Sequence, residues 1–343
     1  MNEQSTSSSY HVYRRLGSTD IEVSSVGIGT WAMGAGWGTQ EDQQSIAALH
    51  RALDLGCRLI DTAQAYGDGR SEQLIGRVLK ERGEHVPVAT KVPPMDGNWD
   101  TIPGVTDIRE KFPAHYLIER CEMSLHNLQV DCVDVYQLHT WCPSWNHETE
   151  WYEAMLKLKE QGKIKAIGIS VSDHRPDEAN GTIAAGRVES IQVIYNLLEQ
   201  RPRSHLFPLA RTHHVGILAR VPLASGALSG TWDEHKTFAP DDWRASVFSG
   251  ETLRRTVAHV NALKQIAAEV GCSMLEFALR FCISDPTVSS TIPGARTPEQ
   301  AESLMHAMQA GPLPEAALRR IDELWEQEFK HHIRTSIGPG SEG

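Results

Sequence analysis

Short runs of apolar residues alternate with helical patterns along most of the chain. Each run is followed by a segment whose apolar residues recur three and four positions apart, which is the spacing of one helix face. The runs are apolar at consecutive positions, as is typical of strands buried on both faces of a parallel sheet. Repeated strand-and-helix units therefore predict an α/β protein. The eight predicted strands lie at 23–31, 56–61, 86–92, 133–139, 163–170, 189–196, 215–223 and 289–295.

Residues that are typical of helix ends occur where this alternation of strands and helices places them. Gly56 comes directly after an apolar helical stripe, where a helix that ends in a left-handed residue places glycine. Ser273 and Glu276 have the spacing of a capping box at the start of a helix. Eight such units need roughly 250 residues as a closed (β/α)8 TIM barrel, so a chain of 343 residues accommodates one barrel. An open doubly wound sheet is the alternative.

No linker or low-complexity tract divides the chain. We therefore predict one domain over residues 13–330 between mobile tails at 1–12 and 331–343, which are rich in polar or small residues. The remaining segments are predicted to be a β-hairpin at about 11–22, long loops at 93–112, 141–150 and 225–250, and a final helix that begins near Pro314.

The composition is that of an ordinary globular protein, with 40% hydrophobic and 22% charged residues. The chain has 33 Lys and Arg against 44 Asp and Glu, a net charge of −11. Without a basic block, this charge disfavours nucleic acid and anionic membranes as partners. The N-terminus has no pattern of a secretory signal, and the six cysteines are scattered, as is typical of reduced thiols in the cytoplasm. We expect a cytoplasmic protein, and its oligomeric state is open.

Several common site motifs are absent from the sequence. There is no phosphate-binding loop of the form G-x-x-x-x-G-K-[ST], no G-x-S-x-G nucleophile turn and no H-E-x-x-H zinc motif. The glycine cluster at 27–38 lacks the G-x-G-x-x-G spacing of a Rossmann dinucleotide site. Two pairs of histidines are adjacent in sequence, so their side chains point to different sides and do not chelate together. We therefore expect no metal.

Polar residues recur where the predicted strands end. The parallel strands of a barrel end at one mouth, where active sites of barrel enzymes are built. Neighbouring strands lie about 4.8 Å apart, so side chains at these ends can converge. Tyr66, five residues beyond the second strand, can fold back over them. The strand-end residues are Asp61, Lys91, His139, Ser170 and Gln192.

These residue types suit the protonation of an oxygen. A phenol with a pKa near 10 is a poor acid at neutral pH, and the Lys91 ammonium is expected to lower the pKa of Tyr66, while Asp61 keeps Lys91 charged. A neutral His139 can orient a carbonyl oxygen. The set therefore predicts a proton donor aimed at a developing alkoxide, with a hydride supplied by a cofactor. A Schiff-base lyase with Lys91 as the nucleophile is an alternative, which Asp61 disfavours by keeping the amine protonated.

Several motifs together resemble those of the aldo-keto reductases, in order and in phase over about residues 14–328. They lie at 56–76, 88–92, 133–139, 162–170, 191–196, 221–230 and 291–300. The resemblance implies a barrel that binds NADPH, with NADH possible, at its C-terminal mouth. It implies Tyr66 as the acid, Lys91 and Asp61 as residues that tune it, and His139 as the residue that positions the carbonyl. The cofactor-binding residues that it implies are Ser170, Gln192, Arg220, Leu223, Gly226, Leu228, Gly294, Arg296 and Gln300.

The sequence departs from the family pattern at three places. Val171 stands where the family usually has an asparagine that contacts the carboxamide. Arg220 replaces the aromatic residue that many members place under the nicotinamide, and a guanidinium could stack there or pair with the pyrophosphate. Residues 303–304 are Ser-Leu in place of the Glu-Asn that reads adenine. Arg296 is the candidate for contact with a 2′-phosphate.

The resemblance predicts an NADPH-dependent reductase of small neutral or weakly polar aldehydes and ketones. Trp31, Trp141 and Trp145 lie just past strand ends and could wall an apolar substrate pocket, with packing in the core or in loops as the alternative. A second hypothesis is a cofactor-binding regulatory scaffold with little turnover. The sequence does not identify the physiological substrate or the direction of the reaction.

Overall fold

The computed structural model describes residues 10–34, 41–239 and 242–332. Its eight parallel strands pair in chain order from first to last, and bridges from Val26 to Thr291 and from Gly29 to Gly294 join the two edges. The closed (β/α)8 barrel predicted from the sequence is therefore confirmed. Its strands are β3 (Ile28–Gly29), β4 (Ile60–Asp61), β5 (Val88–Val92), β6 (Val133–Leu138), β7 (Ile164–Ser170), β8 (Ser190–Ile194), β9 (Gly216–Arg220) and β10 (Val288–Thr291).

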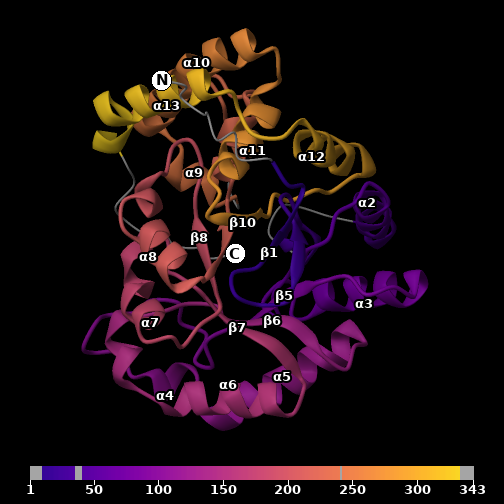
Figure 1. Cartoon of the computed structure of the whole chain (residues 1–343). Coiled ribbons are helices and arrows are strands. Elements are labelled where there is room, and N and C mark those ends of the chain that lie inside the picture. The colour runs from indigo at the N-terminus through magenta and orange to yellow at the C-terminus, as the bar shows by residue number, and fades with distance from the viewer. Residues whose placement is uncertain (1–9, 35–40, 240–241, 333–343) are drawn as a thin grey trace, which may run out of the picture.

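A ring of helices surrounds the strands (Figure 1). The ring is formed by α2 (Asp42–Asp54), α3 (Arg70–Arg82), α5 (Ala114–Leu128), α6 (Glu150–Glu160), α7 (Asn180–Ala184), α8 (Leu206–His213), α11 (Met274–Ser284) and α12 (Pro298–Ala310). Ser273 caps the N-terminus of α11 as predicted, because its hydroxyl accepts the Glu276 N–H at 3.2 Å, and the Glu276 carboxylate pairs with Arg280. Gly56 follows α2 with a φ of +93°, as the helix-end pattern predicts. Helix α12 packs beside α2 and so completes the ring.

Further helices lie outside the repeated units. Two long ones are α10 (Gly250–Val270) and α13 (Glu315–Gln327), and Pro314 precedes α13 directly, as predicted. The three predicted loops contain short helical segments, which periodicity over so few residues did not reveal. The short segments of the chain are α1 (Trp31–Gly34), α4 (Ile108–Lys111), α9 (Arg244–Val247), η1 (Pro143–His147), η2 (Pro176–Ala179), η3 (Arg201–Arg203), η4 (Ala224–Ser229) and η5 (Phe329–His332).

The N-terminal hairpin closes one end of the barrel. Strands β1 (Tyr13–Arg15) and β2 (Glu22–Ser24) pair antiparallel, so the predicted hairpin is present, but β2 extends into 23–31, the range predicted for the first barrel strand. Its buried residues Leu16, Ile21 and Val23 join a cluster with inward-facing residues of the barrel strands. Burial of this apolar surface stabilises the barrel and plugs the end at which the strands begin. The barrel residues of the cluster, which lie in or directly beside the strands, are Leu59, Ala89, Val135, Ala166, Leu218 and Ile292.

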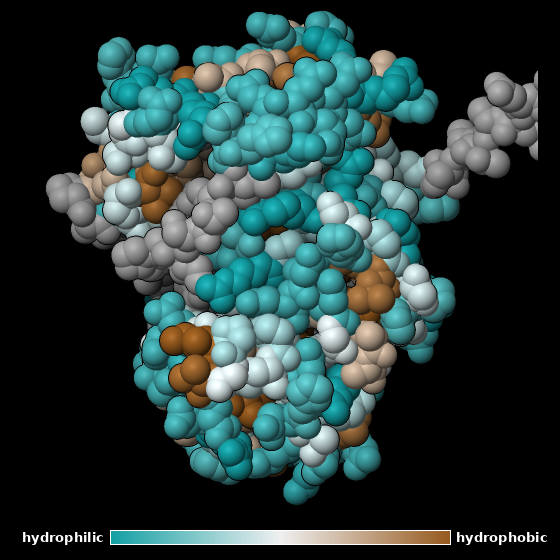
Figure 2. All heavy atoms as spheres, turned by 90° about the vertical axis from the view of Figure 1, so that its left-hand side faces the viewer, coloured by the Kyte–Doolittle hydropathy of each residue, from teal (hydrophilic) through white to brown (hydrophobic). Residues whose placement is uncertain are grey.

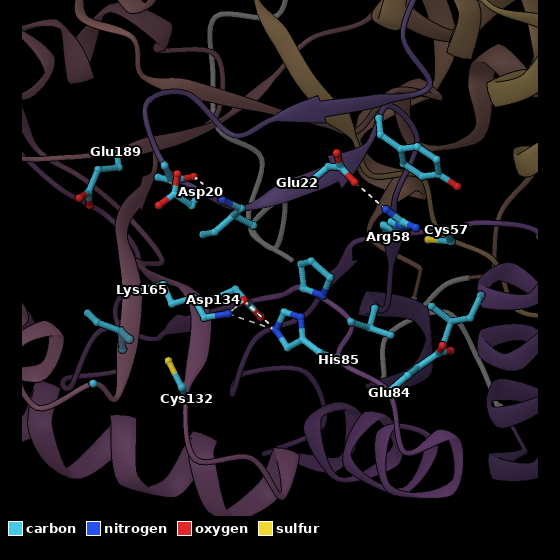
Figure 3. Close-up of a pocket in the computed structure, with 18 of the residues that line it drawn as sticks. Asp20, Glu22, Cys57, Arg58, Glu84, His85, Cys132, Asp134, Lys165 and Glu189 are labelled. Atoms are coloured by element: carbon cyan, nitrogen blue, oxygen red, sulfur yellow. Dashed lines mark hydrogen bonds and ion pairs between the residues drawn. The ribbon is translucent and has the colours of Figure 1, made fainter.

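A polar cavity of about 1100 Å³ lies at this N-terminal end of the strands (Figure 3). The Asp134 carboxylate is 3% exposed and accepts hydrogen bonds from the Lys165 ammonium at 2.6 Å and the Val88 N–H at 3.0 Å. The His85 Nε2 lies 3.0 Å from the same carboxylate. Residues at this face of a barrel generally serve stability. Here the carboxylate ties β6 to β5 and β7.

The face that bears α7 and α8 is largely hydrophilic, and its hydrophobic residues form small, separate patches (Figure 2). No helix of the described part of the chain is long and apolar enough to cross a membrane. All six cysteines are unpaired. Most of the two predicted tails falls outside the described residues, but Tyr10 packs on the barrel, since its hydroxyl donates to the Met308 carbonyl at 2.7 Å.

Candidate active site

Four residues predicted from strand ends and motifs meet at the C-terminal mouth of the barrel. Lys91 on β5 places its ammonium 2.7 Å from Asp61 Oδ1, at the end of β4, and 3.2 Å from the Tyr66 hydroxyl. His139 follows β6, and its ring centroid is 5.7 Å from that of Tyr66 in an edge-on arrangement. The structure therefore brings Asp61, Tyr66, Lys91 and His139 together as the sequence predicts.

A close approach of two backbone segments holds Tyr66 in place. A Cβ on Gly34, at the end of α1, would lie 2.3 Å from the Tyr66 carbonyl carbon. Gly67 has a φ of +67°, and a Cβ there would meet the Gly34 carbonyl oxygen at 2.4 Å. No real Cβ is found so close to backbone, so both positions require glycine. The pair Gly34 and Gly67 therefore turns the chain so that Tyr66 faces Lys91.

Burial and charge together set the protonation of the site. Burial disfavours the charged form of Lys91, but the nearby Asp61 and Tyr66 outweigh it and raise the pKa of the amine. Burial, helped by the charges of Lys91 and Arg220, holds the pKa of His139 well below its ordinary value. Both pKa shifts have the direction that a neutral His139 beside a charged Lys91 requires. In Asp61, burial raises the pKa of the carboxyl despite Lys91.

The expectation of a lowered phenol pKa does not hold. Burial of Tyr66 raises its pKa above the ordinary value, and the opposing effect of the Lys91 ammonium is smaller. The Asp61 carboxylate adds to the rise. The phenol is therefore held in its protonated form at neutral pH, while Lys91 limits the cost of losing the proton.

A cavity of about 610 Å³ opens beside these residues. Its wall includes Tyr66 and Asp61, the turn after β9 and the start of α12. This size is within the range of small-molecule and cofactor sites. A second, small cavity lies between His139 and the ends of β7, β8 and β9. Among the described residues, no three His, Cys, Asp or Glu side chains gather closely enough to hold a metal ion.

The comparison with known proteins agrees with the barrel and its mouth. The family model described as "Aldo/keto reductase family" matches residues 25–326. The chain belongs to the aldo/keto reductase family. It is 34% identical over 298 residues to an aldo-keto reductase of Bacillus subtilis named YhdN. The match covers 85% of this chain and 87% of that protein. A relative in Escherichia coli, named an NADH-specific methylglyoxal reductase, is 30% identical, with 85% of this chain and 92% of that protein covered.

Solved structures agree as well. The structure of the glycerol dehydrogenase AKR11B4 from Gluconobacter oxydans matches with a TM-score of 0.79 and 27% identity. The match covers 95% of this chain and 98% of that chain. Family and named relatives together identify this aldo/keto reductase as an NAD(P)H-dependent oxidoreductase.

The residues around the two cavities suit a nicotinamide dinucleotide. At the catalytic end, the buried atoms His139 Nδ1 and Arg220 Nε have no hydrogen-bond partner among the described residues, so they fit the polar groups of a bound molecule. Ser170 lines the small cavity, and Gln192 lines both. The predicted cofactor residues that line the large cavity are Gln192, Arg220, Leu223, Gly226, Gly294, Arg296 and Gln300.

Three predicted residues lie elsewhere. Leu228 is fully buried in the main hydrophobic core and lines neither cavity. Trp141 and Trp145 are also buried, because their rings pack edge-on at 5.5 Å and Trp141 packs on Trp151 of α6. Of the three predicted pocket tryptophans, Trp31 is the one that lines the large cavity.

Sequence reasoning missed two side chains of the site. Trp99, in the predicted loop 93–112, packs edge-on against the His139 ring with 4.8 Å between centroids. Asp173 forms a 2.5 Å ion pair with Arg220. An acid three residues beyond the end of β7 was a signal for Asp173, because Arg220 ends a nearby strand. No spacing pattern pointed to Trp99.

Proposed function

We propose that this aldo/keto reductase reduces small aldehydes and ketones to alcohols with NADPH, and that Tyr66 donates the proton. The proposal rests on the hydrogen bonds of the Lys91 ammonium. It donates to Asp61 and to the Tyr66 hydroxyl at the edge of the large cavity. A bound NADPH would supply the hydride to the carbonyl carbon. The chain must then supply the proton to the carbonyl oxygen.

The side chains divide this work. Tyr66 is held protonated by burial, so it can give its proton as the oxygen becomes an alkoxide. The ammonium of Lys91 stabilises the phenolate that remains, and Asp61 keeps that ammonium charged. His139 is neutral and buried beside Tyr66, so it can hydrogen-bond the same carbonyl oxygen. Trp99 packs on His139 and would limit the movement of that ring.

The proposed cofactor contacts follow the walls of the cavities. Ser170 and Gln192 would hold the carboxamide, although the Gln192 amide now donates to Asp61 at 2.6 Å. Leu223 and Gly226 would cover the pyrophosphate. Gly294, Arg296 and Gln300 would hold the adenosine phosphate, and the charge of Arg296 supports NADPH over NADH.

The contacts of Lys91 argue against the Schiff-base lyase. Its ammonium also donates to the Thr62 carbonyl at 2.8 Å. Three acceptors therefore surround the nitrogen, and Asp61 and Tyr66 raise the pKa of the amine. A nucleophilic amine needs a free lone pair. This environment instead supports a fixed cation.

The test is a panel of small carbonyl compounds and alcohols followed by nicotinamide absorbance, with NADPH and NADH in separate assays. We expect oxidation of NADPH with reactive aldehydes, and a lower KM for NADPH than for NADH. The Tyr66→Phe variant should lose turnover by about 100-fold or more and keep its affinity for NADPH. Binding of NADPH without turnover of any carbonyl would favour the regulatory scaffold instead. Loss of turnover together with cofactor affinity would contradict the role of Tyr66.

We also propose that the protein works in the cytoplasm on small-molecule substrates. Six unpaired cysteines support a reducing compartment. Cell fractionation with an antibody to the chain tests this location, and recovery in a secreted fraction would contradict it.

A further inference from the structure

The Arg220 side chain is a buried cation in the wall of both cavities. It ends β9, and the side chain is 11% exposed. Its Nη2 donates to Asp173 Oδ1 at 2.5 Å and to the Val171 carbonyl at 2.9 Å. Its Nε is buried without a hydrogen-bond partner among the residues that the structure describes. The guanidinium is therefore anchored at one end and incompletely satisfied at the other.

The backbone after Arg220 is shaped to keep it there. Val221 has a φ of +55°, in the left-handed region that a β-branched residue rarely adopts. The Asn196 side chain holds this turn, because its Nδ2 donates to the Val221 carbonyl at 3.0 Å. Such a conformation persists where the surroundings over-determine it, and it is concentrated at functional sites. Arg220 is thus fixed in position as well as buried.

Arg220 faces the place where reduction must occur. It lines the large cavity with Tyr66 and Asp61, and the small cavity with His139. A ring that passes a hydride to a carbonyl held by Tyr66 and His139 must lie within this part of the cavity. The charge of Arg220 already acts here. It adds to burial and Lys91 in lowering the pKa of His139, and it opposes the burial that raises the pKa of Tyr66 and of Asp61.

We propose that the Arg220–Asp173 pair makes the pocket selective for the charge of the nicotinamide ring. The oxidised ring carries a positive charge that the reduced ring lacks, so a fixed cation beside it repels NADP⁺ but not NADPH. A neutral aromatic residue at this position would not discriminate in this way. The charge of Arg220 therefore favours binding of the reduced cofactor over the oxidised one. This inference rests on the proposed function.

The two members of the pair act in opposite directions. The Asp173 carboxylate offsets part of the charge of Arg220 and attracts the oxidised ring. Loss of the Arg220 charge should therefore reduce the preference for NADPH over NADP⁺, and loss of the Asp173 charge should increase it. A purely structural pair would behave differently, because either substitution would then weaken both cofactor forms alike.

The experiment measures the Kd of NADPH and of NADP⁺ by titration, with quenching of the fluorescence of the nine tryptophans as the signal. The readout is the ratio of the Kd for NADP⁺ to the Kd for NADPH. Arg220→Met should lower this ratio by about 10-fold, and Asp173→Asn should raise it by about 3-fold, from Coulomb interactions screened by the partly polar site. Arg203→Met, which breaks an ion pair with Asp322 outside both cavities, is the matched control and should leave the ratio unchanged.

The outcomes separate the inference from the proposed function. If Arg220→Met and Asp173→Asn leave the ratio unchanged, or move it in the same direction, the inference is overturned while the proposed function stands. If the wild-type protein binds neither cofactor, the proposed function fails, and the inference fails with it. Should Arg220→Met not fold because Asp173 is left unpaired, the double variant Arg220→Met/Asp173→Asn has no unpaired charge. It should still lower the ratio, and an unchanged ratio there also overturns the inference.

Discussion

Substitution of Lys91 by methionine isolates the buried ion pair at the centre of the site. Lys91 is fully buried, and methionine keeps most of its length while removing the charge. The Asp61 carboxylate would lose its bond of 2.7 Å to the ammonium. It would keep the amide of Gln192, which donates to Asp61 Oδ2 at 2.6 Å. The variant would therefore hold an uncompensated carboxylate inside the barrel.

The size of the effect follows from that burial. Removing one partner of a buried ion pair costs about 3–5 kcal/mol. This is a large part of the roughly 5–15 kcal/mol that usually separates a folded domain from its unfolded state. The double variant Asp61→Asn/Lys91→Met removes both charges, so it should be more stable than Lys91→Met by about 2 kcal/mol or more. Both variants should lose turnover, because the phenolate of Tyr66 would lose its cation.

The pH dependence of the Lys91→Met variant has a definite sign. Burial raises the pKa of Asp61, and Lys91 opposes that rise. Without Lys91 the folded-state pKa of Asp61 lies higher still, above its unfolded value near 3.9. A carboxyl whose pKa is higher in the folded than in the unfolded protein stabilises the fold when it is protonated. That stability is fully present below the unfolded-state pKa and is lost as the pH rises through the folded-state pKa. Acidification from about pH 8 to pH 5 should therefore narrow the stability gap between Lys91→Met and the double variant.

Urea unfolding followed by tryptophan fluorescence measures this gap at each pH. The double variant shares every other titrating group, so the difference between the two midpoints reports on Asp61. A loss of less than about 1 kcal/mol in Lys91→Met at neutral pH would refute the buried pair as the reason for the effect. Two other results would refute this explanation as well. One is an equal loss of unfolding free energy in Lys91→Met and the double variant, and the other is a stability difference between them that widens on acidification.

Three further predictions concern the reaction and the frame around it. Because burial raises the pKa of Tyr66, the rate of carbonyl reduction should stay level through neutral pH and fall only in the alkaline range; a pH–rate profile that falls between about pH 6 and pH 8 contradicts this. Gly76→Ala should lower the midpoint of thermal unfolding, because the added Cβ would lie 2.4 Å from the Asn127 carbonyl oxygen. Alanine favours helices over glycine by up to about 1 kcal/mol, so a raised midpoint would show that α3 moves to make room for the Cβ. Asp134→Asn should lower the midpoint and leave kcat unchanged, because Asp134 lies at the opposite end of the barrel; a large drop in kcat would count against this separation.

Three of the four residues at the candidate site, Asp61, Lys91 and His139, could be found from the sequence because a general rule places them. Parallel strands of a barrel end at one mouth, so a polar residue at the end of an apolar run is already located in space. Lys91 pairs in register with Gln137 on the next strand, and the backbone of His139 bonds to Val92 one step further. Strand order and residue position are enough for these three residues. Tyr66 lies in the loop after β4, and its position also depends on the close approach of Gly34 and Gly67.

The walls of the substrate pocket follow no such rule. Trp141 and Trp145 come just after β6, like functional residues, but Trp141 packs on Trp151 of α6, and Trp145 packs on Trp141 and Phe112. Trp99 lies in a loop without periodicity, and its contact with His139 depends on how residues 93–107 cross the mouth. Sequence position could not separate these cases, because each depends on packing between segments far apart in the chain.

The pKa of Tyr66 also depends on packing that the sequence alone does not predict. The sequence identifies Lys91 as its neighbour and so predicts the sign of one contribution, which the structure retains. The opposing contribution depends on how completely protein replaces water around the phenol, and it is the larger of the two. A phenol with a raised pKa is present almost entirely in its protonated form at neutral pH, but each proton that it gives costs more free energy than in water. The Lys91 ammonium, 3.2 Å from the hydroxyl, offsets part of that cost, so its position matters more for the reaction than the pKa of the phenol alone.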